Sequence, residues 1–187
     1  MKKTWLIILA VVVVIAVYGV STYNSLVSTN EQVDAQWAKV ETQYQRRFDL
    51  IPNLVNSVKG ILTQEQTIFN NIADARTRYS GASTPNDKAV AASEMESALG
   101  RLLVIMENYP QLNSSANVAD LMAQLEGTEN RIGVERSRFN DEVRDYNLAV
   151  KRFPKKLFAS LFGFGERAYF ESADGAAAAP NVNLDLQ

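Results

Sequence analysis

Apolar side chains recur every three or four residues along most of this chain, which is the spacing of one face of an α-helix. The pattern is clearest in the run Arg46–Gly60, where it is carried by Phe48, Ile51, Leu54, Val55 and Val58. A proline, Pro52, lies in the middle of this run. Proline inside a helix cannot donate a backbone hydrogen bond and costs roughly 3 kcal/mol. We therefore expect the helix either to bend at Pro52 or to begin a new segment there.

The same apolar stripe extends from Thr22 to about Tyr79, and the only glycine in this stretch is Gly60. It predicts one very long helix, bent at Pro52 and weakened at Gly60. The turn residues of Ser80–Asp87 end it.

Two further helices are predicted, from about Asp87 to Asn108 and from about Ala116 to Val150. The third has a heptad-like apolar seam, into which Thr128 and Glu135 also fall. No stretch alternates apolar and polar residues as a strand would. The sequence therefore predicts an all-α fold. An N-terminal transmembrane helix continues into an extended antiparallel bundle of long helices, three in number, followed by a short C-terminal helical segment.

Helix lengths predict a topology. At 1.5 Å per residue, the first helix beyond the membrane covers about 85 Å, the second about 33 Å and the third about 50 Å. Short turns make sequential helices antiparallel, so the third helix is expected to end far from the membrane. We therefore expect residues 157–170, which include Phe158 and Phe162, to cap the open end of the bundle. Because Lys155 and Lys156 precede them, an interfacial membrane helix and a protein-partner site remain alternatives.

The N-terminal segment is typical of a membrane anchor. Residues Trp5–Val20 carry no charge, and they would form about 24 Å of helix. We expect an uncleaved signal-anchor over residues 1–21 that contacts the lipid bilayer through residues 5–20, with a cleaved signal peptide as the alternative. Lys2 and Lys3 place the N-terminus on the cytoplasmic side by the positive-inside rule, and hence the body on the extracytoplasmic side. The helical body is expected over residues 22–171 and a flexible Ala-rich tail over 172–187.

Composition excludes several kinds of chemistry. The chain has no Cys and no His, which removes disulfides, Cys/His zinc sites, thiol nucleophiles and imidazole catalysis. Its net charge is -2, and without Lys2 and Lys3 the 19 basic residues become 17 against 21 acidic ones. Nucleic acid requires clustered positive charge, so we expect no such partner. With no phosphate loop and no nucleophile elbow in the sequence, we expect no enzyme activity, no cofactor, no metal and no small-molecule substrate.

Several motifs resemble those of the LemA family of bacterial membrane proteins. Besides Arg46–Gly60 they are Tyr23–Val27, Ala35-Gln36-Trp37, Ala75-Arg76, Glu107–Pro110, a pattern over Glu129–Asn147, and the closing Pro180–Leu184, where Leu184 replaces an aromatic residue. The similarity covers nearly the whole chain in the same order. It implies a single-pass protein of the bacterial cell (inner) membrane with a long-helix bundle and no assigned biochemical activity.

The polar residues around Pro52 are candidates for a structural or interaction role. They are Arg46, Arg47, Asp49, Pro52 and Asn53, together with Glu107, Tyr109 and Pro110 at the end of the second helix. If the second helix runs back along the first from Tyr79, Glu107 would come near Arg46 or Arg47. We interpret this group as a structural joint that fixes the register of neighbouring helices.

These observations favour a membrane-anchored protein of the cell envelope that acts as a scaffold or adaptor through a protein partner or self-association. Two other functions remain open, an envelope sensor or signalling stalk and a filament-type structural subunit. The filament is disfavoured because the processing site and the acidic residue of pilin-like subunits are missing. The sensor is disfavoured because only four residues precede the apolar stretch.

Overall fold

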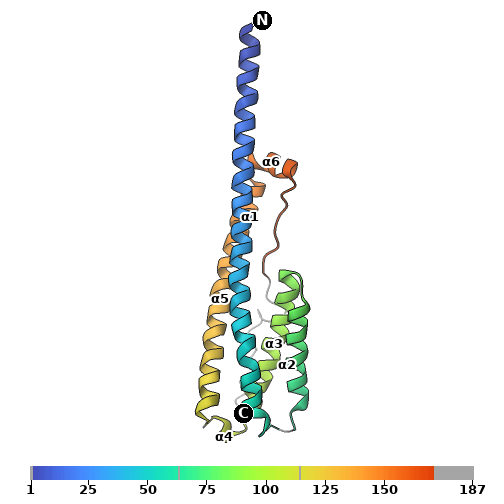
Figure 1. The fold of residues 1–187 in the computed structure, drawn as a ribbon, viewed down its shortest axis with the longest axis vertical. Helices are drawn as coiled ribbons and strands as arrows, with labels where there is room; N and C mark the ends of the chain where they lie inside the picture. The colour runs from blue at the N-terminus through green and yellow to red at the C-terminus, as the bar shows by residue number, and fades with distance from the viewer. Residues whose placement is uncertain (1, 63, 114, 171–187) are drawn as a thin grey trace, which may run out of the picture. The chain divides into compact units, whose positions relative to one another are not determined.

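The computed structural model describes residues 2–62, 64–113 and 115–170, and within these ranges the chain is helical without any strand (Figure 1). The helices are α1 (Lys2–Lys59), α2 (Gln66–Gly81), α3 (Pro85–Met106), α4 (Pro110–Asn113), α5 (Ala116–Lys151) and α6 (Lys155–Phe162). The predicted all-α fold is confirmed. The predicted tail, residues 172–187, lies outside the described residues.

The first helix ends earlier than expected. α1 runs through Pro52 without interruption and stops at Lys59, so the break lies at Gly60 and the predicted extension to Tyr79 is wrong. Glycine is a weak helix former, and the helix ends just before Gly60. At Pro52 the packing of apolar side chains on both sides offsets the cost of the proline, so the helix continues. Leu54 and Val58, which follow Pro52, are both fully buried. The amide of Leu62 closes the helix end by donating to the carbonyl of Val58 (2.9 Å).

The described chain forms two compact units, to each of which α1 and α5 contribute. Among the described residues, the first unit contains 2–41 and 133–169, and the second contains 42–62, 64–113 and 115–132 with Phe170.

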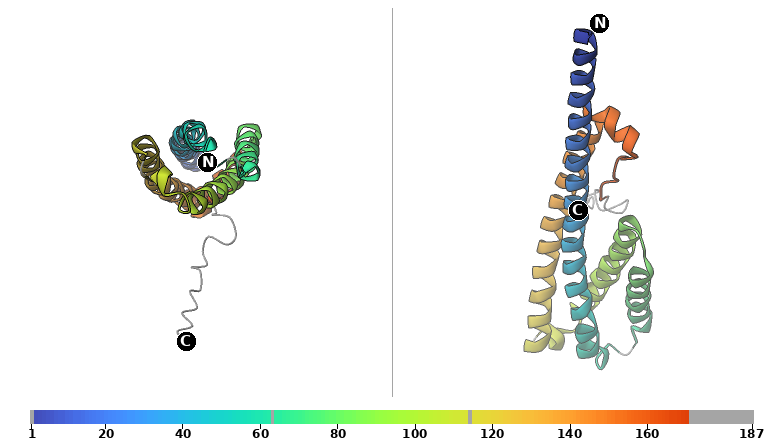
Figure 2. Two further views of the ribbon diagram at one scale, coloured as in Figure 1. Left: turned by 90° about the horizontal axis from the view of Figure 1, so that it is seen from below. Right: turned by 45° about the horizontal axis from the view of Figure 1, so that its top comes forward.

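In the first unit, α5 runs antiparallel beside α1 (Figures 1 and 2). The Trp37 and Phe139 rings meet edge to face with centroids 5.3 Å apart. Further along, Lys155 at the start of α6 donates to the hydroxyl of Ser25 (3.3 Å). The chain after α5 therefore returns towards the apolar stretch of α1. The expectation that the third long helix ends far from the membrane is wrong. The chain makes one additional reversal of direction, at Gly60, that the sequence pattern did not indicate.

In the second unit, α2 and α3 form a hairpin beside residues 42–59 of α1 (Figure 2). The Tyr79 ring packs on those of Phe48 (4.4 Å between centroids) and Tyr44 (5.6 Å). Thr84 caps α3 by accepting a hydrogen bond from the amide of Asp87 (3.1 Å), and Pro85 occupies the first turn, where no donor is needed.

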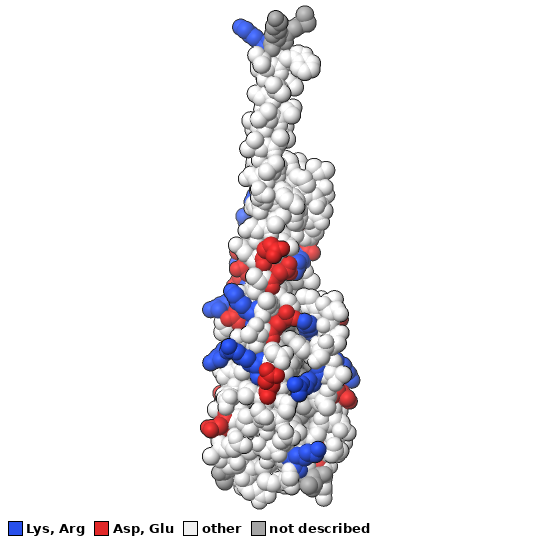
Figure 3. All heavy atoms as spheres, viewed as in Figure 1, with Lys and Arg blue, Asp and Glu red and all other residues white. Residues whose placement is uncertain are grey.

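Among the described residues, one helix, α1, is long and apolar enough to cross a membrane. Only 6% of its most apolar window is buried within the structure. The visible surface of this stretch shows no charged side chain below the blue group at its upper end (Figure 3). Such a surface is consistent with a lipid-facing segment.

Candidate functional site

The best-defined polar site of the second unit is centred on Arg47 of α1. Its guanidinium pairs with the carboxylate of Glu129 on α5 and lies 3.6 Å from that of Glu96 on α3. The Arg47 side chain is 11% exposed, against 27% for Glu96 and 45% for Glu129. One cation thus joins three helices, which is the geometry of a register-fixing joint.

The carboxylates around Arg47 differ from the one the sequence suggested. α3 runs in the same direction as residues 42–59 of α1, because α2 has already turned back (Figure 1). Glu96 therefore comes level with Arg47, and Glu107 lies about 16 Å further along α3. Glu107 is exposed and forms the C-terminal cap of α3, where its amide donates to the carbonyl of Leu103 (3.2 Å).

Arg46 and Asp49 are exposed on α1 and face a shallow cavity of about 590 Å³. The Asp49 carboxylate accepts a hydrogen bond from the amide of Gln45 (2.9 Å). The opposite wall belongs to α5 and includes Asp120 and Arg131. Charges of both signs line this cavity, so it has no strong preference for either kind of ion.

The remaining predicted site residues occupy structural positions. Pro52 is half-buried inside α1, and the carbonyl of exposed Asn53 accepts the hydroxyl of Ser57 (2.8 Å). Tyr109 lies half-buried between α3 and α4, and Pro110 begins α4. The structure thus brings Arg46, Arg47 and Asp49 near α5 and keeps the Glu107–Pro110 group at the end of α3.

A second, larger cavity of about 680 Å³ lies beside Arg47 between α3 and α5. Its lining is mainly apolar and includes Leu99, Leu103 and Met122, with Glu126 and Glu129 as the acidic groups. Among the described residues, no cluster of three or more His, Cys, Asp or Glu side chains is placed to hold a metal ion.

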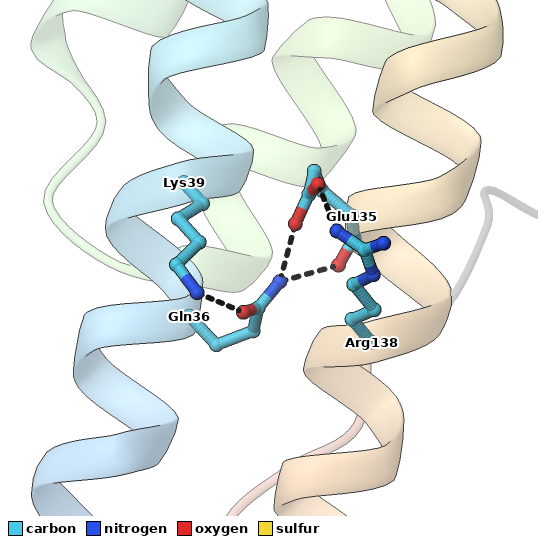
Figure 4. A network of polar contacts seen from close by, with 4 residues as sticks. All are labelled: Gln36, Lys39, Glu135 and Arg138. Atoms are coloured by element: carbon cyan, nitrogen blue, oxygen red, sulfur yellow. Dashed lines mark hydrogen bonds and ion pairs between the residues drawn. The ribbon is translucent and has the colours of Figure 1, made fainter.

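The first unit contains a polar network that sequence reasoning missed (Figure 4). Gln36, only 5% exposed, donates its amide to the carboxylate of Glu135 (2.6 Å) and accepts from Lys39 (3.0 Å). Arg138 pairs with the same carboxylate of Glu135 (2.7 Å). The available signal was Glu135 itself, the one charged residue on the predicted seam of the third helix, which indicates a polar partner.

A second missed pair holds the segment after α6 onto α5. Asn147 donates to the carbonyl of Arg167 (2.9 Å) and accepts from its amide (2.8 Å), so both backbone groups of Arg167 are satisfied by one buried side chain. The Arg167 guanidinium pairs with Asp34 and donates to Asn30 (3.2 Å) on α1. Next to this group, burial raises the pKa of the Tyr146 phenol above its ordinary value, the Arg167 charge lowers it, and the Asp34 charge raises it.

The family model for the LemA family matches residues 36–184. The chain belongs to the LemA family. This match includes the Arg47 site and the Gln36–Glu135 network, and it confirms the resemblance found in the sequence motifs.

Three curated relatives of this LemA-family chain are magnetosome proteins. "Magnetosome protein MamQ" of Magnetospirillum gryphiswaldense is 28% identical over 174 residues, which cover 79% of this chain and 64% of the relative. "Magnetosome protein MamQ 1" and "MamQ 2" of Paramagnetospirillum magneticum are each 27% identical over 175 residues, covering 80% of this chain and 64% of the relative. The chain therefore spans less than two thirds of the length of these relatives. Family membership and the apolar N-terminal helix together indicate a membrane-associated helical protein.

Proposed function

We propose that this LemA-family chain is a single-pass protein of the bacterial cell envelope, and that it serves as a scaffold or adaptor without catalysis of its own. In this proposal the helical body stands on the extracytoplasmic side and binds other proteins. The observation that carries it is the continuity of α1, in which the apolar stretch and the longest helix of the body form one helix, Lys2–Lys59, without a break. A continuous helix transmits the orientation of the anchor to the first unit, whereas a loop would leave the unit free to turn.

The orientation rests on charge. Lys2 and Lys3 precede the apolar stretch, and the next basic residue along the sequence is Lys39. The positive-inside bias is set by basic residues close to the ends of the spanning segment, so the N-terminus is assigned to the cytoplasm.

The absence of Cys makes the orientation directly testable, because one introduced thiol is unique. Glu142→Cys on α5 should react with a membrane-impermeant maleimide in intact spheroplasts. Glu142 is half-buried, so Arg138→Cys at an exposed position of the same helix serves as a second site, and a cysteine at Lys2 should react only after lysis. Labelling of the body only after lysis would overturn the placement.

The scaffold role is tested by photo-crosslinking in living cells. A photoreactive residue is placed at exposed apolar positions on α3, Val90 (56% exposed) and Val104 (62%), and at exposed polar positions on another helix, Asp141 and Asp145 of α5, as controls. We expect the same discrete adduct from one or both apolar positions and none from the controls. Adducts only with a second copy of the chain would instead support a filament-type role, and no adduct at native expression would reject the proposal.

The relatives bear on the partner. Their names assign them to the magnetosome, and the alignments with them cover 79% and 80% of this chain. We propose that the shared body provides the membrane-attached scaffold in both cases and that the bound partner differs between them.

A further inference from the structure

α6 lies against the end of the uncharged stretch of α1. The Phe158 ring centroid is 5.5 Å from that of Tyr18, and the Phe162 centroid is 5.2 Å from that of Tyr23. Gly19 permits the close approach, since a Cβ there would lie 3.0 Å from Cε1 of Phe158. These contacts fix the position of α6 along α1.

This position coincides with the expected membrane surface. The stretch Trp5–Val20 spans about 24 Å, and a hydrocarbon core of about 30 Å would extend slightly beyond it, to the level of Tyr23. Aromatic side chains with a polar end, such as Tyr18 and Tyr23, concentrate at the membrane–water interface. α6 therefore lies at headgroup level if α1 spans the bilayer.

The part of α6 that does not contact α1 exposes large apolar side chains. Leu157 and Leu161 are 63% and 76% exposed, and they share one face because they are one helical turn apart. Phe153, just before the helix, is 80% exposed. On the visible face, the bulge formed by α6 shows no charged side chain among the described residues (Figure 3).

Basic residues flank this apolar group. Residues 151–165 include Lys151, Arg152, Lys155 and Lys156 and no acidic residue, and α1 has no acidic residue before Glu31. Arg152 and Lys156 are exposed, whereas Lys151 pairs with Glu166 (2.7 Å) and Lys155 bonds to Ser25. A basic rim around exposed leucines matches the chemistry of an anionic phospholipid surface.

We propose that α6 is an interfacial membrane helix. Phe153, Leu157 and Leu161 insert at the boundary between headgroups and acyl chains, and Arg152 and Lys156 bind lipid phosphates. The bilayer then holds the first unit at two places, the spanning stretch of α1 and the face of α6, which fixes the tilt of α1. The inference rests on the membrane anchoring in the proposed function, and it replaces the capping role that the sequence pattern favoured for residues 157–170.

The experiment uses the full chain, one copy per nanodisc, in phosphatidylcholine with phosphatidylglycerol. Single nitroxide labels are placed at Leu157→Cys and Leu161→Cys, at Val12→Cys in the spanning stretch, and at Val134→Cys, a matched control that is 50% exposed on α5. Collision with oxygen, which enters lipid, is compared with collision with a water-soluble nickel chelate. We expect the oxygen-to-nickel ratio to be severalfold higher at positions 157 and 161 than at 134, and highest at 12.

Three results would overturn the inference. Ratios at 157 and 161 equal to that at 134, with Val12→Cys in lipid, would reject the interfacial helix and leave the anchor intact. Protection of 157 and 161 from both reagents would indicate contact with protein. Water access at position 12 would reject the anchor and the interfacial helix together.

The role of charge is tested by the double variant Arg152→Gln/Lys156→Gln, with Arg76→Gln/Arg101→Gln as a control of the same net charge. Arg76 and Arg101 are exposed in the second unit. We expect the first variant to lower the ratio at 161 in anionic discs to its value in pure phosphatidylcholine, and the control to leave it unchanged. An equal effect of both variants would reject the binding of lipid phosphates by Arg152 and Lys156.

Discussion

The guanidinium of Arg47 on α1 and the carboxylate of Glu129 on α5 form an ion pair within the second unit. The arginine is nearly buried, at 11% exposure of its side chain, and the carboxylate of Glu96 on α3 lies 3.6 Å from the same guanidinium. Arg47 follows Arg46 directly in the sequence, yet only Arg47 faces inward. A buried cation that depends on two carboxylates from two other helices makes the packing of all three helices interdependent.

Replacement of Arg47 by alanine should destabilise the second unit. Removing one member of a buried pair leaves the other uncompensated, at a typical cost of about 3–5 kcal/mol. Glu129 is half exposed, so we expect a loss at or below the lower end of that range. Urea unfolding followed by circular dichroism in detergent measures it, and a loss within experimental error would show that the pair does not fix the packing.

A double-mutant cycle identifies the partner of Arg47. Arg47→Ala combined with Glu129→Gln should show a coupling of about 0.5–3 kcal/mol, the range found for residues in contact. The same cycle with Glu107→Gln should be additive, because Glu107 lies at the far end of α3. Coupling to Glu107 rather than to Glu129 would mean that the register of α3 is wrong.

Two glycines on helices should respond oppositely to alanine. A Cβ at Gly133 on α5 would meet nothing within 4 Å, so Gly133→Ala should stabilise the protein by about 0.5–1 kcal/mol. A Cβ at Gly19 on α1 would approach the Phe158 ring to 3.0 Å, so Gly19→Ala should gain less or lose stability. Thermal unfolding of both variants measures the difference, and equal gains would show that α6 does not pack on Gly19.

The helical class was predictable from the sequence because helix periodicity is local, and the apolar stripe persists over many turns. The position of the break, at Gly60, was not predictable in this way. Gly60 and Pro52 each weaken a helix, and local propensity alone does not decide which of them interrupts it. Tertiary packing decides it, through the burial of Leu54 and Val58 on one side of the break and of Leu62 on the other. Once the break is misplaced, the direction of every later helix is reversed.

That error explains which parts of the site were missed. Arg47 was identified because it lies in an unusual run, but its partners depend on the direction of α3, so Glu107 was chosen in place of Glu96 and Glu129. The same reversal placed residues 157–170 far from the membrane. By contrast, Glu135 could have been recognised locally, as an acidic residue on an apolar seam.

The reciprocal bonds of Asn147 lead to a further prediction. Asn147→Ala removes both hydrogen bonds to the backbone of Arg167 and leaves two partly buried backbone groups without that partner, at about 1–3 kcal/mol for each buried group left unsatisfied. We expect the segment after α6 to detach from α5, while α1 and α5 stay packed against each other. Amide hydrogen exchange should therefore increase for residues 163–169 and remain slow at Phe139 and Val143. Unchanged exchange in that segment would contradict the assigned role of Asn147.

Pro52→Ala measures how much the proline lowers the free energy of unfolding. Alanine restores a donor to the carbonyl of Phe48, and proline in a helix interior costs roughly 3 kcal/mol. The more flexible unfolded chain offsets about 0.4–1 kcal/mol of the gain. We expect a net stabilisation of about 2–2.6 kcal/mol in urea unfolding, the difference between these two terms. A loss of stability would show that the backbone around Pro52 is shaped to the proline ring.

The stability of the first unit should decrease in alkali, partly through Tyr146. Burial raises the pKa of this phenol above its ordinary value of 10.0, so the folded state keeps its proton to a higher pH than the unfolded state does. Below about pH 9 both states are protonated and the group contributes no pH dependence. Above pH 10 unfolding releases a proton, and the free energy of unfolding falls with rising pH by at most about 1.4 kcal/mol per pH unit. Tyr146→Phe should remove this part of the slope and leave stability at pH 7 nearly unchanged.

The pKa of Lys151 is also raised, by its hydrogen bond to Glu166, and its contribution is lost over the same alkaline range. Lys151→Gln is therefore the control. If the Tyr146→Phe variant keeps the full alkaline slope in urea unfolding, the slope arises from groups other than the phenol.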